Sequence, residues 1–209
     1  MNGKDIECVA PKSLRDPVAQ ARRVAALHAP HIAPLTEFVE ALRAEVGPDY
    51  SIPYFDPFDG GTVATLLYLL EAPGPKAVAS GFVSRDNPDE TAKNFLLLNQ
   101  EAGIDRRTSV VWNIVPWYLG DGARIRAAGV GDTTAGARSL ERLFGLLPRV
   151  RCIALLGKHA AKAEPLIRGI RPAATIVSVP HPSPMFVNRA PGNRERLLAG
   201  FRDVAARMG

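Results

Sequence analysis

The chain has 209 residues, of which 46% are hydrophobic and 22% are charged, a mixture typical of one globular domain. A chain of this length can bury a sizeable core without disulfides or metals. The composition excludes disordered, collagen-like and coiled-coil proteins, and no apolar run reaches the ~18 residues that a membrane span needs.

The net charge of +5 is unevenly distributed. Residues 149–209 hold 11 Lys and Arg against 3 Asp and Glu, whereas residues 1–148 hold 15 against 18. Most of the cations are arginines, which bind phosphate with two parallel hydrogen bonds. This excess has two explanations, a polyanionic partner or a genome rich in Arg codons. The first residues lack the charged and then apolar layout of a signal peptide, so we expect a cytoplasmic protein.

The first quarter of the chain predicts two helices after a loose tail of residues 1–14. Asp16 and Pro17 are typical of a helix start, as cap and first helical residue. The helix that follows has an apolar stripe formed by Val18, Ala21, Ala25 and Leu27. A second helix is expected at about 35–46, where apolar residues recur at helical spacing. We expect both helices, within residues 15–50, to pack on a core formed by residues 51–209.

From residue 51 onward, expected strands alternate with expected helices. After a loop at 51–61, apolar runs typical of buried strands stand at 63–70, 109–115, 150–156 and 174–179. Helices are expected at about 87–102, starting with Asn87 as cap, and at about 133–147, 158–169 and 193–208. This alternation predicts an α/β fold with a central four-stranded parallel sheet and helices on both faces.

Active sites of open parallel sheets lie beyond the carboxyl ends of the strands. At these four places the sequence reads Glu71-Ala-Pro-Gly-Pro75, Asn113, Gly157-Lys-His159 and His181-Pro-Ser-Pro184. Asn113 stands in an apolar strand, where its amide needs a partner. It either reads the edge of an amide-like ligand or holds a neighbouring loop.

The flanking prolines hold His181 rigidly, which suits a hydrogen bond to a developing oxyanion or acid–base catalysis. A structural hydrogen bond is the commoner role of a lone loop histidine. Ser183 and the helix start at Gly157-Lys158 are candidate phosphate sites, although Gly157 also suits an ordinary strand-to-helix turn. The glycine spacings of a dinucleotide fingerprint, a P-loop and a serine-hydrolase elbow are absent.

Taken in order, these strand ends resemble the uracil-DNA glycosylase superfamily over about residues 52–209. Asp-Pro-Phe-Asp-Gly-Gly at 56–61, Ser-Arg-Asp-Asn at 84–87 and Trp-Asn-Ile-Val-Pro-Trp at 112–117 are similar to bacterial members. The resemblance implies an enzyme of base excision repair that flips uracil out of DNA and hydrolyses its N-glycosidic bond. The partner implied is uracil-containing DNA, single- or double-stranded, and the oligomeric state implied is a monomer. We expect no strand cleavage, because no lysine stands where a Schiff-base nucleophile is expected.

The resemblance also implies a role for individual residues. His181 would stabilise negative charge on the O2 atom of the base, and Asn113 would read the pyrimidine edge. Phe82 would stack on the flipped base, beside the loop of Ala72, Pro73 and Gly74. DNA contacts would come from Thr91, Gly157, Lys158 and Ser183 at phosphates, and from Met185 as the minor-groove wedge.

The chain departs from the family pattern in two places. Ala72 stands where several families carry a water-activating Asp or Asn. Glu71 follows the pattern of the iron–sulfur families and is the second catalytic candidate. Asp56 and Asp59 are further candidates for the group that activates the attacking water. Those families need four cysteines, and this chain has two, Cys8 and Cys152. We therefore expect no cluster, no metal and no cofactor.

Three other functions remain open at this point. The first is a glycosylase of the same fold that removes another base, such as hypoxanthine, xanthine or an oxidised pyrimidine. The second is a non-catalytic DNA-binding protein, which Ala72 would favour. The third is an α/β enzyme with a small-molecule substrate, although no cofactor motif supports it.

Overall fold

The computed structural model describes residues 10–120 and 124–208. Its central sheet has four parallel strands in the order β4-β2-β5-β6. The strands are β2 (Leu66–Leu70), β4 (Ser109–Asn113), β5 (Cys152–Leu156) and β6 (Thr175–Val179). The predicted α/β fold with a central four-stranded parallel sheet is confirmed.

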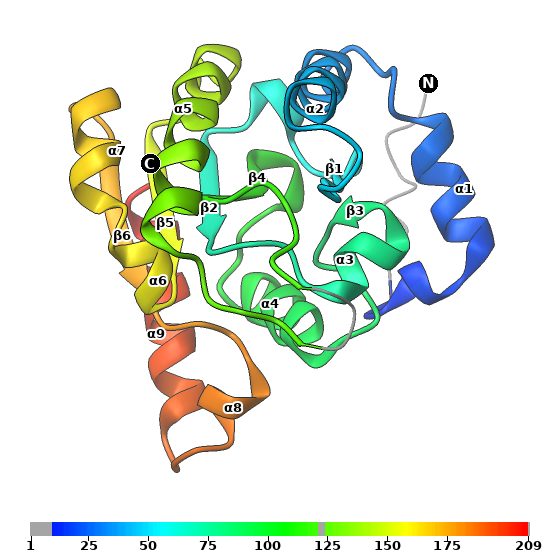
Figure 1. Cartoon of the computed structure of the whole chain (residues 1–209). Coiled ribbons are helices and arrows are strands. Elements are labelled where there is room, and N and C mark those ends of the chain that lie inside the picture. The colour runs from blue at the N-terminus through cyan, green and yellow to red at the C-terminus, as the bar shows by residue number, and fades with distance from the viewer. Residues whose placement is uncertain (1–9, 121–123, 209) are drawn as a thin grey trace.

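Helices precede, connect and follow these strands (Figure 1). They are α1 (Pro17–Ala25), α2 (Ala33–Val46), α3 (Pro75–Ser80), α4 (Glu90–Glu101), α5 (Val130–Leu146), α6 (Lys158–Ala161), α7 (Glu164–Ile170), α8 (Pro184–Val187) and α9 (Asn193–Ala206). Short 3-10 helices occur at η1 (Ser13–Arg15), η2 (Gly61–Val63) and η3 (Arg106–Thr108). No helix within the described ranges is long and apolar enough to cross a membrane.

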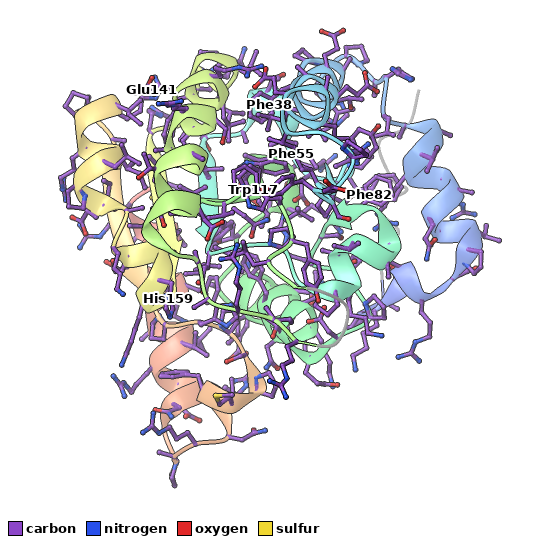
Figure 2. All side chains as sticks on the ribbon, viewed as in Figure 1. Phe38, Phe55, Phe82, Trp117, Glu141 and His159 are labelled. Atoms are coloured by element: carbon purple, nitrogen blue, oxygen red, sulfur yellow. The ribbon has the colours of Figure 1, made fainter. Side chains whose placement is uncertain are left out.

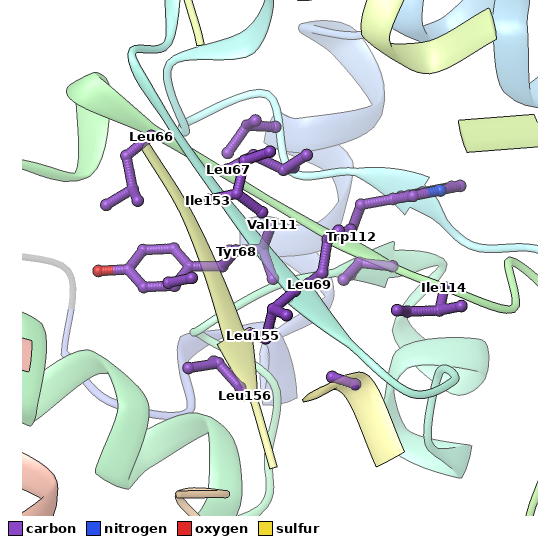
Figure 3. Packing of buried hydrophobic residues seen from close by; sticks show 14 of the residues in the cluster. Leu66, Leu67, Tyr68, Leu69, Val111, Trp112, Ile114, Ile153, Leu155 and Leu156 are labelled. Atoms are coloured by element: carbon purple, nitrogen blue, oxygen red, sulfur yellow. The ribbon is translucent and has the colours of Figure 1, made fainter. Parts of the chain in front are cut away.

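Neighbouring side chains along a strand point to opposite faces of the sheet, and this alternation assigns the helices to two layers. Tyr68 and Trp112 leave the sheet in opposite directions (Figure 3). On one face, Phe38 of α2 meets the Trp112 ring edge-on, with ring centroids 6.1 Å apart. On the other face, Phe95 of α4 and Phe201 of α9 meet the Tyr68 ring at 4.8 Å and 6.0 Å.

A second, two-stranded parallel sheet was not expected from the sequence. It pairs β1 (Tyr54–Phe55) with β3 (Phe82–Val83). Strands of two residues carry no periodic pattern, so nothing in the sequence distinguished residues 54–55 from the surrounding loop. This pair lies beside the central sheet and leads directly into the segment that follows Val83 (Figure 1).

Helix α1 forms where it was predicted, but it packs differently. Asp16 caps it by accepting a hydrogen bond from the Val18 N–H at 2.9 Å. The predicted apolar stripe is wrong, because Val18 is 59% exposed and the buried residue of the helix is Arg23. Leu14, within the segment expected to be a loose tail, is also buried.

Two predicted helices differ in their details, each because of a nearby residue. The cap of α4 is Asp89, whose Oδ1 accepts from the Ala92 N–H at 2.8 Å, and not Asn87, whose side chain is turned inward. The predicted helix at 158–169 is divided into α6 and α7. Pro165 stands in the first turn of α7, because a proline inside a continuous helix would remove a hydrogen bond and clash with the preceding turn.

Candidate active site

A cavity of about 340 Å³ opens at the carboxyl ends of β2 and β4. Its walls come from the loop after β2, the start of α3, the segment after β3, the first turns of α4 and the loop after β6. The polar or charged lining residues are Lys76, Ser84, Asn87, Asp89, Thr91, Asn113 and His181. The sequence placed the site at the strand ends, and the cavity lies there.

Asn113 is the last residue of β4 and pairs with Leu70 at the end of β2. Its side chain is 2% exposed, and its Nδ2 atom has no hydrogen-bond partner among the described residues. A buried amide without a partner costs ~1–3 kcal/mol. Two roles were left open for Asn113. This geometry favours a side chain that hydrogen-bonds to a ligand over one that holds a neighbouring loop in place.

His181 lies two residues beyond the end of β6 and is largely buried at the cavity wall. Burial lowers the pKa of His181 below its ordinary value, although the negative charges of Glu71 and Asp89 oppose this effect. This shift favours the neutral imidazole, which can donate one hydrogen bond from a ring N–H.

Gly157, between β5 and α6, positions this histidine. Its backbone has a φ of +95° and a ψ of 166°, and its N–H donates to the Val179 carbonyl at 2.8 Å. A Cβ at this position would meet the Cβ of His181 at 3.0 Å. Gly157 is therefore needed for the approach of the loop after β6, whether or not it also contacts DNA.

Behind the cavity lies a group of buried charges, which we call the ion cluster. It consists of Arg23, Arg85, Arg106, Asp56, Asp59 and Asp86. Arg106 alone contacts all three carboxylates, at 2.8 Å from Asp56, 2.8 Å from Asp59 and 2.7 Å from Asp86. The cluster thus joins α1, the loop after β1, the segment after β3 and η3.

The ion cluster reaches the cavity through Ser84. The Ser84 hydroxyl donates to Asp56 and accepts from the Asp86 N–H at 2.9 Å. Burial opposes the ionisation of Asp56, but Arg106 and Arg23 outweigh it and hold the pKa of this carboxyl below its ordinary value. Asp56 and Asp59 belong to this cluster and do not line the cavity, although the Oδ2 atom of Asp59 has no hydrogen-bond partner among the described residues. The structure therefore does not place either carboxylate where it could activate a water molecule in the cavity.

The sequence model of the uracil DNA glycosylase superfamily matches residues 59–204, which is more than half of the chain. The chain belongs to the uracil DNA glycosylase superfamily. Among solved structures, one match is the solution NMR structure of a "putative Uracil DNA glycosylase" from Methanosarcina acetivorans. It is 16% identical in sequence, its alignment covers 69% of this chain and 92% of that chain, and the TM-score is 0.47. No curated protein sequence matches the chain.

For a superfamily member, the position of Phe82 is unexpected. Its ring is 1% exposed and packs with Leu14, Leu27 and Tyr54. Phe82 is the first residue of β3, as Figure 2 shows, and it does not line the cavity. This position does not fit the predicted stacking role. The aromatic ring that lines the cavity is Phe95 of α4, which the sequence analysis missed because a Phe on an amphipathic helix resembles any core residue.

Glu71 also lies outside the cavity lining. Its Oε1 accepts from the Ala128 N–H at 2.8 Å and lies 3.5 Å from Nδ1 of His159. The side chain thus holds the segment that precedes α5. Its negative charge acts on the pKa of His181 from outside the cavity.

The remaining predicted residues fall into two groups. Ala72, Pro73, Gly74 and Thr91 line the cavity. Lys158 is exposed at the start of α6, Ser183 caps α8, and Met185 is 82% exposed. Met185 shares a surface hollow with Pro184, Asn188 and Arg189.

Within the described residues no group of three or more His, Cys, Asp or Glu side chains is arranged to hold a metal ion. Cys152 is a buried free thiol in β5, and burial raises its pKa to about 11. Cys8 lies outside the described residues.

Proposed function

We propose that this protein is a monofunctional DNA glycosylase that hydrolyses the N-glycosidic bond of uracil in DNA. One observation carries the proposal: the unpartnered amide of buried Asn113 and the imidazole of His181 line the same cavity. Superfamily membership supports a DNA glycosylase in general, and the pairing of these two side chains favours a base with carbonyl groups.

The cavity volume of about 340 Å³ is at the small end of ligand pockets, which suits one base flipped out of the stack. The Asn113 Nδ2 would donate to a carbonyl oxygen of the base, which supplies the partner that the buried amide lacks. Phe95 and Val83, which also line the cavity, provide apolar surface for the ring.

When the glycosidic bond breaks, its electron pair moves to the base and the sugar becomes positively charged. The neutral His181 would donate its N–H to the O2 atom, where negative charge grows. One such donor contributes ~2.7–4 kcal/mol, so its loss should slow excision by about 100- to 1,000-fold.

The absence of strand cleavage is part of this proposal. One lysine, Lys76, lines the cavity. It is exposed on α3, whereas nucleophilic lysines are activated by desolvation or by a neighbouring cation. Borohydride in the reaction would trap a Schiff base, and we expect no trapped complex.

DNA binding is proposed to involve Lys158, Ser183, Met185 and the backbone at Gly157. Phosphate contacts of this kind position the protein without reading the sequence, and they weaken steeply as salt rises. The excess of Arg and Lys in residues 149–209 supports such contacts. We propose a cytoplasmic monomer, and gel filtration at several protein concentrations tests the oligomeric state.

The deciding experiment measures excision from labelled oligonucleotides that carry a single uracil, single- or double-stranded, with alkali to reveal abasic sites. The wild-type protein should excise uracil, and His181→Ala and Asn113→Ala should both be strongly impaired at unchanged melting temperature. Excision of hypoxanthine, xanthine or an oxidised pyrimidine instead of uracil would replace the substrate in this proposal. Salt-sensitive binding without excision of any base would overturn it.

A further inference from the structure

One charged group of the cavity has no role in the mechanism above. Among the described residues that line the cavity, Asp89 is the one carboxylate. Ala72 lies in the same lining and offers only a methyl group where several related families carry Asp or Asn. Asp56 and Asp59 do not reach the cavity, and Glu71 contacts Ala128 and His159 instead.

We propose that Asp89 is a catalytic residue that stabilises the positively charged sugar and accepts a proton from the attacking water. This inference rests on the proposed glycosylase function and adds to it the group that Ala72 cannot provide.

The position of Asp89 is held by its role as helix cap. Its Oδ1 accepts from the Ala92 N–H at 2.8 Å, which orients the carboxylate at the start of α4. Within the described residues no hydrogen bond occupies Oδ2. The cap therefore fixes one oxygen and leaves the other for a water molecule or the sugar.

Helix α4 is in turn tied to the loop that carries His181. Asn94, one turn into α4, donates from Nδ2 to the Pro182 carbonyl at 3.0 Å. Asp89 and His181 thus line one cavity from two joined segments. The negative charge of Asp89 raises the pKa of His181, although the larger effect of burial lowers it.

The chemistry balances with these two side chains and one water. The bond between C1′ and the base nitrogen breaks, and its electron pair leaves with the base, whose O2 atom His181 stabilises. The water oxygen bonds to C1′, and one water proton passes to the Asp89 carboxylate and then to solvent. The base anion takes a proton from solvent, so the products are the free base and an abasic site.

The variant Asp89→Asn separates the catalytic role from the capping role. Asparagine caps helices as well as aspartate does, so the stability of α4 should not change. The carboxylate charge and the proton acceptor are lost. A positioned base contributes about 100- to 10,000-fold, and we expect a fall of this size in the single-turnover rate of excision.

Asp105→Asn is the matched control. Asp105 also caps a helix, η3, by accepting from the Arg107 N–H at 2.8 Å, but it is exposed and does not line the cavity. We expect the wild-type excision rate and melting temperature for this variant. Equal rates for Asp89→Asn and wild type would overturn the proposal.

A second measurement does not depend on turnover. Affinity is compared for two oligonucleotides with abasic analogues, one with a cationic pyrrolidine and one with a neutral tetrahydrofuran. The wild-type protein should prefer the cationic analogue about 10-fold or more, and Asp89→Asn should lose this preference. Lys76, a cation that lines the cavity, is the same in both proteins.

This comparison also separates the two proposals. Failure to excise uracil by the wild-type protein, with a cation preference that depends on Asp89, would overturn the proposed substrate and leave Asp89 supported. Excision of uracil with a preference that is unchanged in Asp89→Asn would support the substrate and overturn the role of Asp89. If Asp89→Asn has a lowered melting temperature, the ratio of its affinities for the cationic and the neutral analogue still tests the role of Asp89.

Discussion

Gly157 and His181 are in contact across the ends of β5 and β6, and a Cβ on Gly157 would lie 3.0 Å from the Cβ of His181. The backbone of Gly157, with φ +95° and ψ 166°, is in a region that is open essentially to glycine alone. The glycine after one strand thus sets the position of the histidine after the next.

Gly157→Ala tests this relationship. The strained backbone should lower the free energy of unfolding by ~1–3 kcal/mol, and the added methyl should displace His181. The rate of excision should fall even at a temperature at which the variant is fully folded, so that unfolding does not account for the loss. Gly145→Ala is the control, because no atom lies near its Cβ position in α5, and it should raise stability by ~0.5–1 kcal/mol.

Asn113→Ala should reduce activity without reducing stability. The Nδ2 atom has no partner in the described structure, so its removal should leave the free energy of unfolding unchanged or slightly higher. The single-turnover rate should fall by about 100-fold or more, since the amide then no longer reads the base. Urea denaturation and excision assays on the same preparation check both parts. A large loss of stability would instead assign Asn113 a structural role.

The free energy of unfolding should depend on pH through His181. Because burial lowers the pKa of His181 in the folded protein, the unfolded chain binds a proton at a higher pH than the folded chain does. Stability should therefore fall as the pH drops below about 6.5, the ordinary pKa of histidine. Urea denaturation at pH 7.5 and 5.5 gives the free energy of unfolding at each pH. The difference between the two values should be smaller for His181→Asn than for wild type. An identical difference in both proteins would contradict this assignment.

The ion cluster should dominate the stability of the N-terminal region. Arg23→Ala would remove one of the two arginines that contact Asp56 and Asp86 and would leave Arg106 as their other partner. Breaking a buried ion pair costs up to ~3–5 kcal/mol, and we expect a loss of stability toward this size. Arg207→Ala, which removes an exposed ion pair with Asp203, should cost under ~1 kcal/mol. Denaturant midpoints of both variants make the comparison. We also expect Arg23→Ala to weaken excision, because Ser84 at the cavity accepts from Asp86 and donates to Asp56.

Met185→Ala should affect the excision of uracil from double-stranded DNA and leave the stability of the fold unchanged. The side chain is 82% exposed on α8, so the melting temperature should stay the same. If Met185 enters the duplex as a wedge, the variant should excise uracil from double-stranded DNA several-fold more slowly. Single-stranded substrate needs no wedge, and its rate should be unaffected. Equal losses on both substrates would argue against the wedge.

Much of the central fold could be predicted from local pattern. The strands β2, β4 and β5 are near-continuous buried apolar runs, the edge strand β6 is partly buried, and helices such as α2 and α9 carry apolar residues at helical spacing. These patterns are local, so the alternation of elements and the parallel sheet followed directly from them. The strand ends also located Asn113 and His181, because the geometry of a parallel sheet brings the carboxyl ends of its strands to one edge.

The side-chain environment of the site could not be predicted in the same way. Phe82 stands where a stacking residue is expected. Because it belongs to the β1–β3 pair, however, its ring packs against Leu14 and Leu27. Val18 suggested that α1 docks through an apolar stripe, but the helix is held by Arg23 and two distant aspartates. Both outcomes depend on contacts between segments far apart in the chain, which leave no local pattern.

Sequence alone determined the α/β class, the strand ends as the place of the site, and the resemblance to a glycosylase superfamily. These features depend on local periodicity and on short motifs. Only the tertiary structure decided which groups share the cavity: Phe95 and Asp89 line it, while Phe82, Glu71, Asp56 and Asp59 do not. The physical reason is that burial, pKa and hydrogen-bond partners are properties of neighbours in space, and folding chooses those neighbours by packing the whole chain.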